Sequence, residues 1–548
     1  MTSSLFRGRP RRVPAHVRVR VARALAGAVA GGGWLVSPVM TVGAQDPVPA
    51  GPAAAAASAA APGEDGAAAT DLVLPLFAVG AAGVLAGYGY LRRARRARTR
   101  TTPGVVSPAP PVPTVAQAER QARAALVLAD DCVRASGEEL PFVAARFGER
   151  EVEPYARALG GAGAELASAF ALWRRYGEGL PKDTGARRQA LAGVVGRCAE
   201  AGRLLDAGAE GLDRLRGLEH GVREALEVAE GRFRELAART VAARATVAAL
   251  RARYAASAGA PVAGYAEQAE DRIVFATSQL NGARQSADAG DGRRAARHLR
   301  AAEGAVAQAG VLVDGVERLA ARLREAAGLV PAALTGAEAE IAAVRGGRAP
   351  ASPSAGELHA RLAHADGVLA AVREELTGGR YDPLDALRRI TRAVRRLEAG
   401  RPGVLEAATR LVARSAVGAA EDYVTVHRAA VGAEARTLLA EAVRALGPCD
   451  GAGDVRVWAR ALRTRPARTA RAPGPRDDEA DVWAGRARES AERDVRGHGG
   501  PRADPDGRTA GLDGAVLGGI LLAQEPDGGP PVSFGGPRAR GRRRLPAP

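Results

Sequence analysis

An apolar or small residue recurs at alternating steps of four and three along one long stretch of the chain. Such a line of residues, a heptad seam, limits the folds that the chain can adopt. The seam runs without interruption through Val222, Leu226, Ala229, Phe233, Leu236, Thr240, Ala243, Val247, Leu250 and Tyr254. Steps of three and four return to the same face of an α-helix, so the stretch predicts one helix of more than four heptads. Such a helix buries its stripe by packing against other helices.

Two neighbouring stretches carry seams of the same kind. One contains Tyr265, Ala269, Ile273, Ala276, Leu280 and Ala283, and the other contains Leu299, Ala302, Val306, Ala309, Val313, Val316, Ala320 and Leu323. Breaks are predicted at Ser257–Pro261 and at Gly290-Asp291-Gly292, where small residues and proline favour turns. Three long helices with short connections fold back as an antiparallel bundle. The predicted fold class is therefore all-α, an elongated antiparallel helical bundle or coiled coil.

Composition favours narrow helix contacts over large globular cores. Only 4% of the 548 residues are aromatic, whereas 68 are glycine. We expect a long helical bundle over residues 116–345, a linker at 346–356 and shorter helices over 357–446. The helical stretches within these regions are expected at 116–177, 185–255, 357–376, 383–398 and 404–446. Residues 447–548 show little periodicity and are rich in Gly, Pro, Arg and Asp, so we expect a mostly disordered tail, interrupted by the short apolar segment Gly514–Ala523.

The first 44 residues have the order of a secretory signal. Seven arginines between residues 7 and 23 precede an uncharged stretch, Ala24–Ala44, which ends in the small residues Val42-Gly43-Ala44. A basic region, an apolar region and small residues in this order predict a signal peptide or signal anchor at residues 1–44. Residues 45–71 are rich in Ala, Pro and Gly and form a stub that is too short for a domain.

A membrane span is predicted directly after this stub. Leu72–Leu91 is a run of twenty uncharged residues, the length that crosses about 30 Å of hydrocarbon. Six arginines between residues 92 and 100 follow it, and a Pro-rich linker continues to residue 115. Because arginine-rich flanks stay on the cytoplasmic side, residues 45–71 are expected outside and the helical body inside. This orientation holds whether or not the signal is cleaved, and it predicts a single-pass protein of the cell membrane.

The net charge of +17 is unevenly distributed. Residues 1–115 hold 13 arginines and four acids, whereas residues 116–446 hold 47 basic and 43 acidic residues. Much of the excess therefore flanks the predicted signal and span, which makes nucleic acid an unlikely partner. An arginine cluster near the C-terminus fits a solubilising tail, contact with anionic lipid or contact with nucleic-acid phosphates. It consists of Arg538, Arg540, Arg542, Arg543 and Arg544.

Cysteine and histidine spacing argues against a metal site. Cys132, Cys198 and Cys449 lie far apart after the span, which favours small buried residues over a disulfide framework or a zinc site. His359 and His364 are five residues apart and so do not share a helix face. The remaining histidines considered, His220, His298 and His427, are isolated in the sequence.

Acidic residues on the predicted helices often have an arginine one turn away, as in Glu230 with Arg234 and Glu235 with Arg239. Such spacing favours solvated ion pairs over a catalytic pair of carboxylates. Phosphate-loop and nucleophile-elbow motifs are not found. We therefore predict a protein that is not an enzyme, with no catalytic, metal-binding or cofactor-binding residues and no evident small-molecule substrate.

Several long blocks resemble the actinobacterial TPM-domain-containing membrane proteins, as found in streptomycetes. They include LVLPLFAVGAAGVLAGYGYLRRARRARTRTTP from Leu72, QARAALVLADDCVR from Gln121, the run from Gly211 to Arg253, PVAGYAEQAEDRIVFATSQLNGARQSADAGD from Pro261, AARHLRAAEGAVAQAGVLVDGVERLA from Ala295, and GAVLGGILL before the Gly/Arg-rich end. The resemblance covers most of residues 72–446. It implies an extracytoplasmic TPM domain associated with metal binding and phosphatase activity before the span, but here the 27-residue stub stands in that place. The chain thus resembles a relative that lacks the TPM domain, or the product of a shortened reading frame, and no residue takes over the enzymatic role of that domain.

These features lead to several functional hypotheses. The first is a membrane-anchored structural or interaction protein, whose cytoplasmic coiled-coil body associates with itself or with protein partners. A phosphatase-type protein is the alternative that the family resemblance implies. A cell-division or envelope scaffold also fits one N-terminal span followed by long helices. Lipid or nucleic-acid binding through the C-terminal arginines is the remaining alternative.

Overall fold

The computed structural model describes residues 113–347, 354–397, 403–447, 476–498, 508–522 and 529–544. Within these ranges every regular element is a helix, and one isolated antiparallel bridge joins Leu521 to Pro531. The predicted all-α class is confirmed. The predicted signal, stub, span and nearly all of the linker, residues 1–112, lie outside the described residues.

The first described helices form a three-helix group in which each helix contacts the other two. They are α3 (Val115–Phe147), α4 (Glu149–Gly177) and α5 (Thr184–Arg216). Thr114 begins α3 with a reciprocal capping pair, because its hydroxyl accepts from the Gln117 N–H while the Gln117 side chain accepts from the Thr114 N–H. Asp183 caps α5 in the same position.

Two helical stretches that the pattern predicts as continuous are interrupted by glycine. The predicted helix 116–177 breaks at Gly148, where φ is 88°, and the predicted helix 185–255 breaks at Gly217, where φ is 50°. Positive φ is open to glycine at little cost, so these residues allow sharp reversals between long helices. The apolar periodicity continues on both sides of each break, which is why it does not reveal them.

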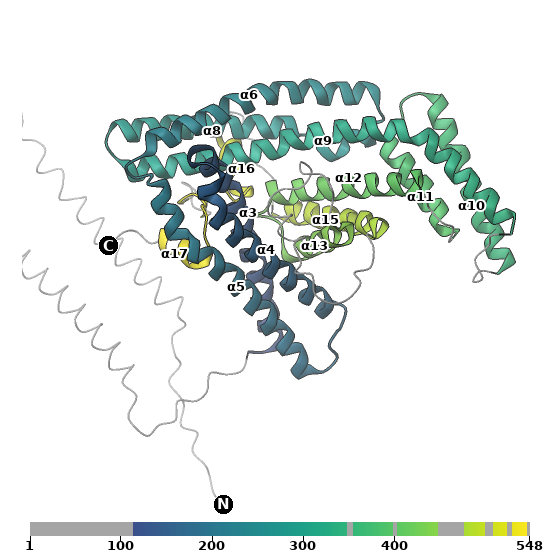
Figure 1. Cartoon of the computed structure of the whole chain (residues 1–548), viewed down its shortest axis with the longest axis horizontal. Helices are drawn as coiled ribbons and strands as arrows, with labels where there is room; N and C mark the ends of the chain where they lie inside the picture. Colours follow the sequence, from purple (N-terminus) through teal and green to yellow (C-terminus); the bar gives the residue numbers. More distant parts are fainter. Residues whose placement is uncertain are drawn as a thin grey trace, which may run out of the picture. The chain divides into compact units, whose positions relative to one another are not determined.

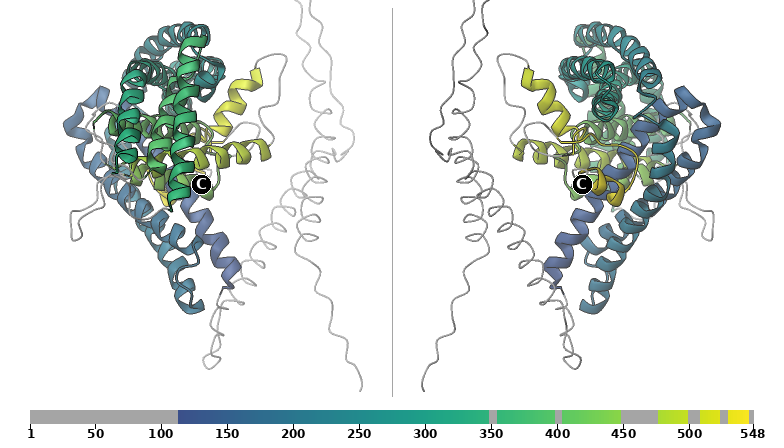
Figure 2. Two further views of the ribbon diagram at one scale, coloured as in Figure 1. Left: turned by 90° about the vertical axis from the view of Figure 1, so that its right-hand side faces the viewer. Right: turned by 90° about the vertical axis from the view of Figure 1, so that its left-hand side faces the viewer.

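A second group consists of α6 (Val222–Arg253), α8 (Tyr265–Asp288) and α9 (Gly292–Arg345), with α7 (Ala256–Gly259) and the 3₁₀ helix η2 (Ala260–Val262) in the first connection. The three long helices contact one another pairwise and run side by side in Figures 1 and 2. The predicted antiparallel bundle and both predicted breaks are confirmed. All three seams face inward, with only Phe233, Ile273 and Ala320 partly exposed.

Helix α9 has 54 residues, which corresponds to about 80 Å at 1.5 Å per residue. Within the described part of the chain it is the helix long and apolar enough to cross a membrane. Its sides contact α6, α8, α11 and α12, and a core helix satisfies the same length and composition.

The later part of the body adds four helices. They are α10 (Ala355–Gly378), α11 (Pro383–Arg396), α12 (Val404–Val426) and α13 (Ala433–Leu446). Of these, α10, α11 and α12 contact α9. The predicted helix 404–446 is wrong in one respect, because a turn at His427–Gly432 divides it into α12 and α13. This turn lets α13 reach α4 and α3, so the later helices join the two groups.

The expectation of a mostly disordered tail is wrong for residues 476–498, 508–522 and 529–544. These segments contain α15 (Asp477–Gly497), α16 (Arg508–Leu517) and α17 (Pro537–Arg544). Helix α15 buries a short alanine seam, Ala480, Ala484, Ala487 and Ala491, against α12 and α13. Charged residues surround these four alanines. The average composition of the segment therefore does not reveal its apolar stripe, which is wide enough for close helix packing.

Two large hydrophobic clusters hold the described body together. One is built mainly from α6, α8, α9, α10, α11 and α12, and the other from α3, α4, α5, α12, α13, α15 and the C-terminal residues Phe534 and Ala539. Helix α12 contributes to both clusters. It therefore lies at the junction where charged side chains from several helices converge.

Candidate functional site

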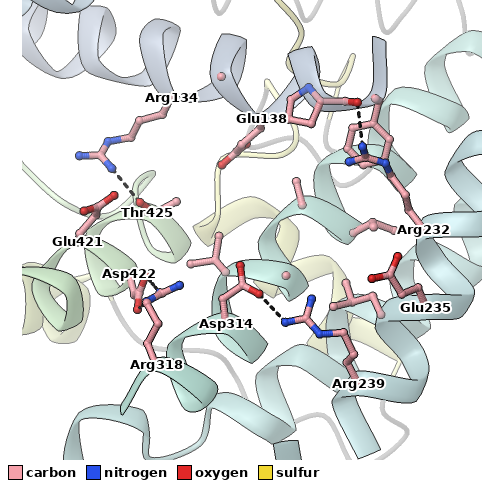
Figure 3. A pocket seen from close by; sticks show the side chains of 18 of the residues that line it. Arg134, Glu138, Arg232, Glu235, Arg239, Asp314, Arg318, Glu421, Asp422 and Thr425 are labelled. Carbon is pink, nitrogen blue, oxygen red and sulfur yellow. Dashed lines mark hydrogen bonds and ion pairs between the residues drawn. The ribbon is translucent and has the colours of Figure 1, made fainter. Parts of the chain in front are cut away.

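A cleft of about 540 Å³ opens where α3, α6, α9 and α12 meet. Figure 3 shows charged side chains from all four helices pointing toward it. The labelled lining residues are Arg134, Glu138, Arg232, Glu235, Arg239, Asp314, Arg318, Glu421, Asp422 and Thr425. Its volume lies within the range of small-ligand pockets, about 300–1,000 Å³.

Small residues create the space in this cleft, and apolar residues line part of it. Gly137, Gly310 and Gly418 line the cleft. A Cβ atom at Gly310 would meet no atom within 4 Å, so this position borders open space. Phe142 and Leu236 supply apolar surface between the charged groups.

Most of the arginines in the cleft are held by carboxylates of another helix. Arg239 of α6 donates to Asp314 and Glu317 of α9, at 2.7 Å each. Arg318 of α9 donates to both carboxylate oxygens of Asp422 on α12, also at 2.7 Å. These pairs join α6, α9 and α12 across the cleft.

Arg134 connects the cleft to a buried ionic network on α3 and α13. Its Nε donates to Asp130 at 2.8 Å, and its Nη1 donates to Thr425 at 2.8 Å. Arg436 reaches the same Asp130 carboxylate and also binds Asp131 at 2.7 Å. Burial would raise the pKa of Asp130, but the guanidinium groups of Arg134 and Arg436 outweigh it and lower that pKa.

Arg232 has a different environment. Its Nη2 donates to the Pro141 carbonyl at 2.9 Å, and its guanidinium lies 4.8 Å from the centre of the Phe142 ring. Among the described residues it forms no ion pair with a carboxylate, although Glu235 and Glu303 act on it through space. Burial lowers the pKa of Arg232, as expected for a cation that is partly removed from water.

A second set of converging residues surrounds the C-terminal strap, defined as residues 529–544. Phe534 is buried against Tyr155 in an edge-on ring contact with centroids 6.0 Å apart. Its backbone N–H donates to the buried Glu139 carboxylate, and the Gly535 N–H donates to the Ser136 hydroxyl at 3.2 Å. The strap therefore packs against α3 and α4 at this point.

Glycine is required where the strap crosses α5. A Cβ atom at Gly536 would lie 2.1 Å from the Gly202 carbonyl oxygen, and a Cβ at Gly202 would lie 2.7 Å from Pro537. Contacts under 3.0 Å with backbone atoms force the chain to move. The two backbones touch only because both residues lack a side chain.

Two of the C-terminal arginines bind within the body, contrary to the expectation of a free tail. Arg540 is buried and donates to the carbonyl oxygens of Asp131 and Cys132, at 3.2 and 3.3 Å. Arg543 pairs with Asp213 at 2.5 Å. Arg538 and Arg542 remain exposed. The cluster is divided because α17 has a face that meets α5 and α3.

For Glu230 and Arg239, pairs between helices replace the predicted pairs within one helix. Glu230 binds Arg284 of α8 at 2.7 Å, while Arg234 donates to the Glu230 backbone carbonyl instead of its carboxylate. Arg239 turns away from Glu235 toward α9. Residue spacing within one helix cannot show that a neighbouring helix supplies a better placed partner.

The described cysteines and histidines do not come together in one site. Cys132 and Cys198 are free and buried, which confirms the prediction for these two; Cys449 lies outside the described residues. His364 contacts Arg396, and His298 contacts Gln279, so the histidines do not converge. Within the described ranges, no group of three or more His, Cys, Asp or Glu residues is arranged to hold a metal ion.

Sequence reasoning missed both the cleft and the strap. The cleft combines residues from four helices that are up to about 290 positions apart, as in the Arg134–Thr425 bond. Gly310 and Arg232 carry no motif that would mark them. The pair Gly535-Gly536 after a lone aromatic residue, Phe534, is the one local signal of a segment that packs closely.

The geometry defines an all-helical protein in which charged side chains brace one helix against another. The chain is similar to two UPF0603 proteins of Mycobacterium tuberculosis, MT2410 of strain CDC 1551 / Oshkosh and Rv2345 of strain ATCC 25618 / H37Rv. Each is 30% identical over 441 residues, which cover 76% of this chain and 64% of the relative. The chain thus spans less than two thirds of the length of these curated relatives. The similarity supports a relationship to an actinobacterial protein family.

No protein-family model matches the chain. No solved structure matches it either.

Proposed function

We propose that this chain is a membrane-anchored structural or interaction protein, with its helical body on the cytoplasmic side and no catalytic site of its own. The proposal rests on the ion pairs that join one helix of the body to another. Arginines of α6 and α9 bind carboxylates of neighbouring helices, as Arg239 of α6 binds Asp314 of α9 and Arg318 of α9 binds Asp422 of α12. Charge used in this way supports a rigid arrangement of helices that can present a surface to a partner.

The predicted span at residues 72–91 supports the anchoring part of the proposal. Its test is fractionation of the full-length chain from lysed cells, followed by carbonate washing of the membranes. We expect the chain to stay with the membranes until detergent is added. A topology reporter fused after residue 110 should give a cytoplasmic signal. Recovery in the soluble fraction, or an extracytoplasmic signal, would contradict the proposal.

The resemblance to TPM-domain-containing membrane proteins supports a different class, a phosphatase-type protein. A metal-dependent phosphatase assay on the purified full chain separates the two classes. Turnover that survives further purification would favour the enzyme, whereas a structural protein gives no turnover above a matched blank.

A further inference from the structure

The apolar end of the cleft contains a cation whose charge is not neutralised by a contacting carboxylate. Arg232 is half-buried, and its one described hydrogen bond goes to a neutral carbonyl, that of Pro141. Its guanidinium covers the Phe142 ring, next to Leu236. A guanidinium has five N–H donors in a planar fork that fits carboxylate and phosphate groups, so most of its donors are free for such a group.

The carboxylates that line the cleft do not compensate for this cation by contact. Asp314 is held by Arg239, Asp422 by Arg318, and Glu138 by Arg428. Glu235 is exposed and forms no described ion pair with Arg232. Asp314, Asp422 and Glu138 are thus held by other arginines, and the Arg232 guanidinium lies over the Phe142 ring.

We propose that this cleft binds an organic oxyanion, a carboxylate or a phosphate monoester, carried on an apolar body. Arg232 binds the oxyanion, and the body lies against Phe142 and Leu236 toward the open space beside Gly310. The volume of about 540 Å³ accommodates a ligand of drug-like size. Such binding would add a ligand to the structural role proposed above, and it does not depend on the membrane anchor.

Isothermal titration calorimetry on the full-length chain tests the proposal with four soluble probes. 4-Phenylbutyrate and phenyl phosphate carry both required parts, one with a carboxylate and the other with a phosphate. 4-Phenylbutanol lacks the charge, and inorganic phosphate lacks the apolar body. We expect at least one of the first two to bind at least about tenfold more tightly than either of the last two. The stronger of the two identifies the oxyanion.

Two variants test whether the preferred probe binds in this cleft. Arg232→Gln removes the cation, and Gly310→Leu fills the open space while leaving Arg232 unchanged; its Cβ would meet no atom within 4 Å. Each should weaken binding of the preferred probe at least about tenfold. The matched controls are Arg234→Gln on the exposed side of α6 and Gly328→Leu on α9, where a Cβ also meets no atom within 4 Å. Both controls should bind as the unchanged chain does.

The same titrations can overturn the proposal. If inorganic phosphate binds as tightly as the preferred probe, the apolar wall contributes nothing; if 4-phenylbutanol does, the charge contributes nothing. Unchanged affinity in Arg232→Gln, or in Gly310→Leu with its helical circular dichroism retained, would place the ligand elsewhere. Absence of binding by both charged aromatic probes would also reject the site.

Discussion

Neutralising Glu139 should destabilise the body in a pH-dependent way. Glu139 is buried, accepts from Arg216 and accepts from the Phe534 N–H of the strap. Burial by itself would raise the pKa of this carboxyl group. The guanidinium groups of Arg216 and Arg300, with the Phe534 N–H, overcome that effect and lower the pKa to about 2.

The magnitude follows from linkage between protonation and folding. A folded-state pKa of about 2, against an ordinary value of 4.5, corresponds to about 3 kcal/mol of stability when Glu139 is fully ionised. This contribution is present above pH 4.5 and is lost as the pH falls toward 2, because the depressed pKa belongs to the folded state. About half of it should remain near pH 3.

Glu139→Gln is the variant for this test, since glutamine is close in shape to a protonated glutamate. The free energy of unfolding is measured by urea titration followed by circular dichroism, near pH 7 and near pH 3. We expect the variant to be less stable by about 3 kcal/mol near pH 7 and by about half as much near pH 3. Glu153→Gln is the control, because the Glu153–Arg157 pair is exposed and should contribute less than about 1 kcal/mol. A difference for Glu139→Gln that does not change with pH would refute the electrostatic reasoning.

Three further predictions concern the strap, the thiols and a buried histidine. Gly536→Ala should lower the melting temperature because its Cβ would collide with a carbonyl oxygen of α5, whereas Gly541→Ala, which meets nothing within 4 Å, should not; equal melting temperatures would contradict the close contact. Burial raises the pKa of Cys132 to about 11 and that of Cys198 to about 12, so mass spectrometry should find both thiols resistant to iodoacetamide near pH 8 until the chain is unfolded. Burial lowers the pKa of His427 to about 4, so the chain should lose stability as the pH falls from about 6.5 toward 4, because there the unfolded chain takes up a proton at this histidine and the folded chain does not; His427→Gln should flatten that part of the pH–stability curve, and an unchanged curve would contradict it.

The bundle was predictable from residue order, while its interruptions were less so. The seams of α6, α8 and α9 face inward as expected, because a period near 3.5 residues fixes which side of a helix is apolar. The pattern does not reveal the breaks at Gly148 and Gly217, because an isolated glycine within a helical pattern can also be tolerated inside a helix. In α15, four buried alanines were enough for close packing although the surrounding composition resembles a disordered tail.

The candidate site was less predictable than the fold. Arg232 and Arg239 are seven residues apart on α6, yet Arg239 binds α9 while Arg232 faces Phe142 of α3. The C-terminal arginines divide in a similar way, with Arg540 buried and Arg542 exposed. Charge and spacing in the sequence are alike in both cases. The difference arises from which helix lies opposite.

The order of residues alone determined the helical class and the inward faces of the long helices, because hydrophobic periodicity acts within a single helix and needs no knowledge of its neighbours. It also predicts the membrane span, which depends only on length and polarity. Only the tertiary structure decided that the chain also reverses at Gly148 and Gly217, which arginines are neutralised and how the strap lies on α3 and α5. Those outcomes depend on contacts between residues far apart in the chain, and such contacts form only after the helices have packed.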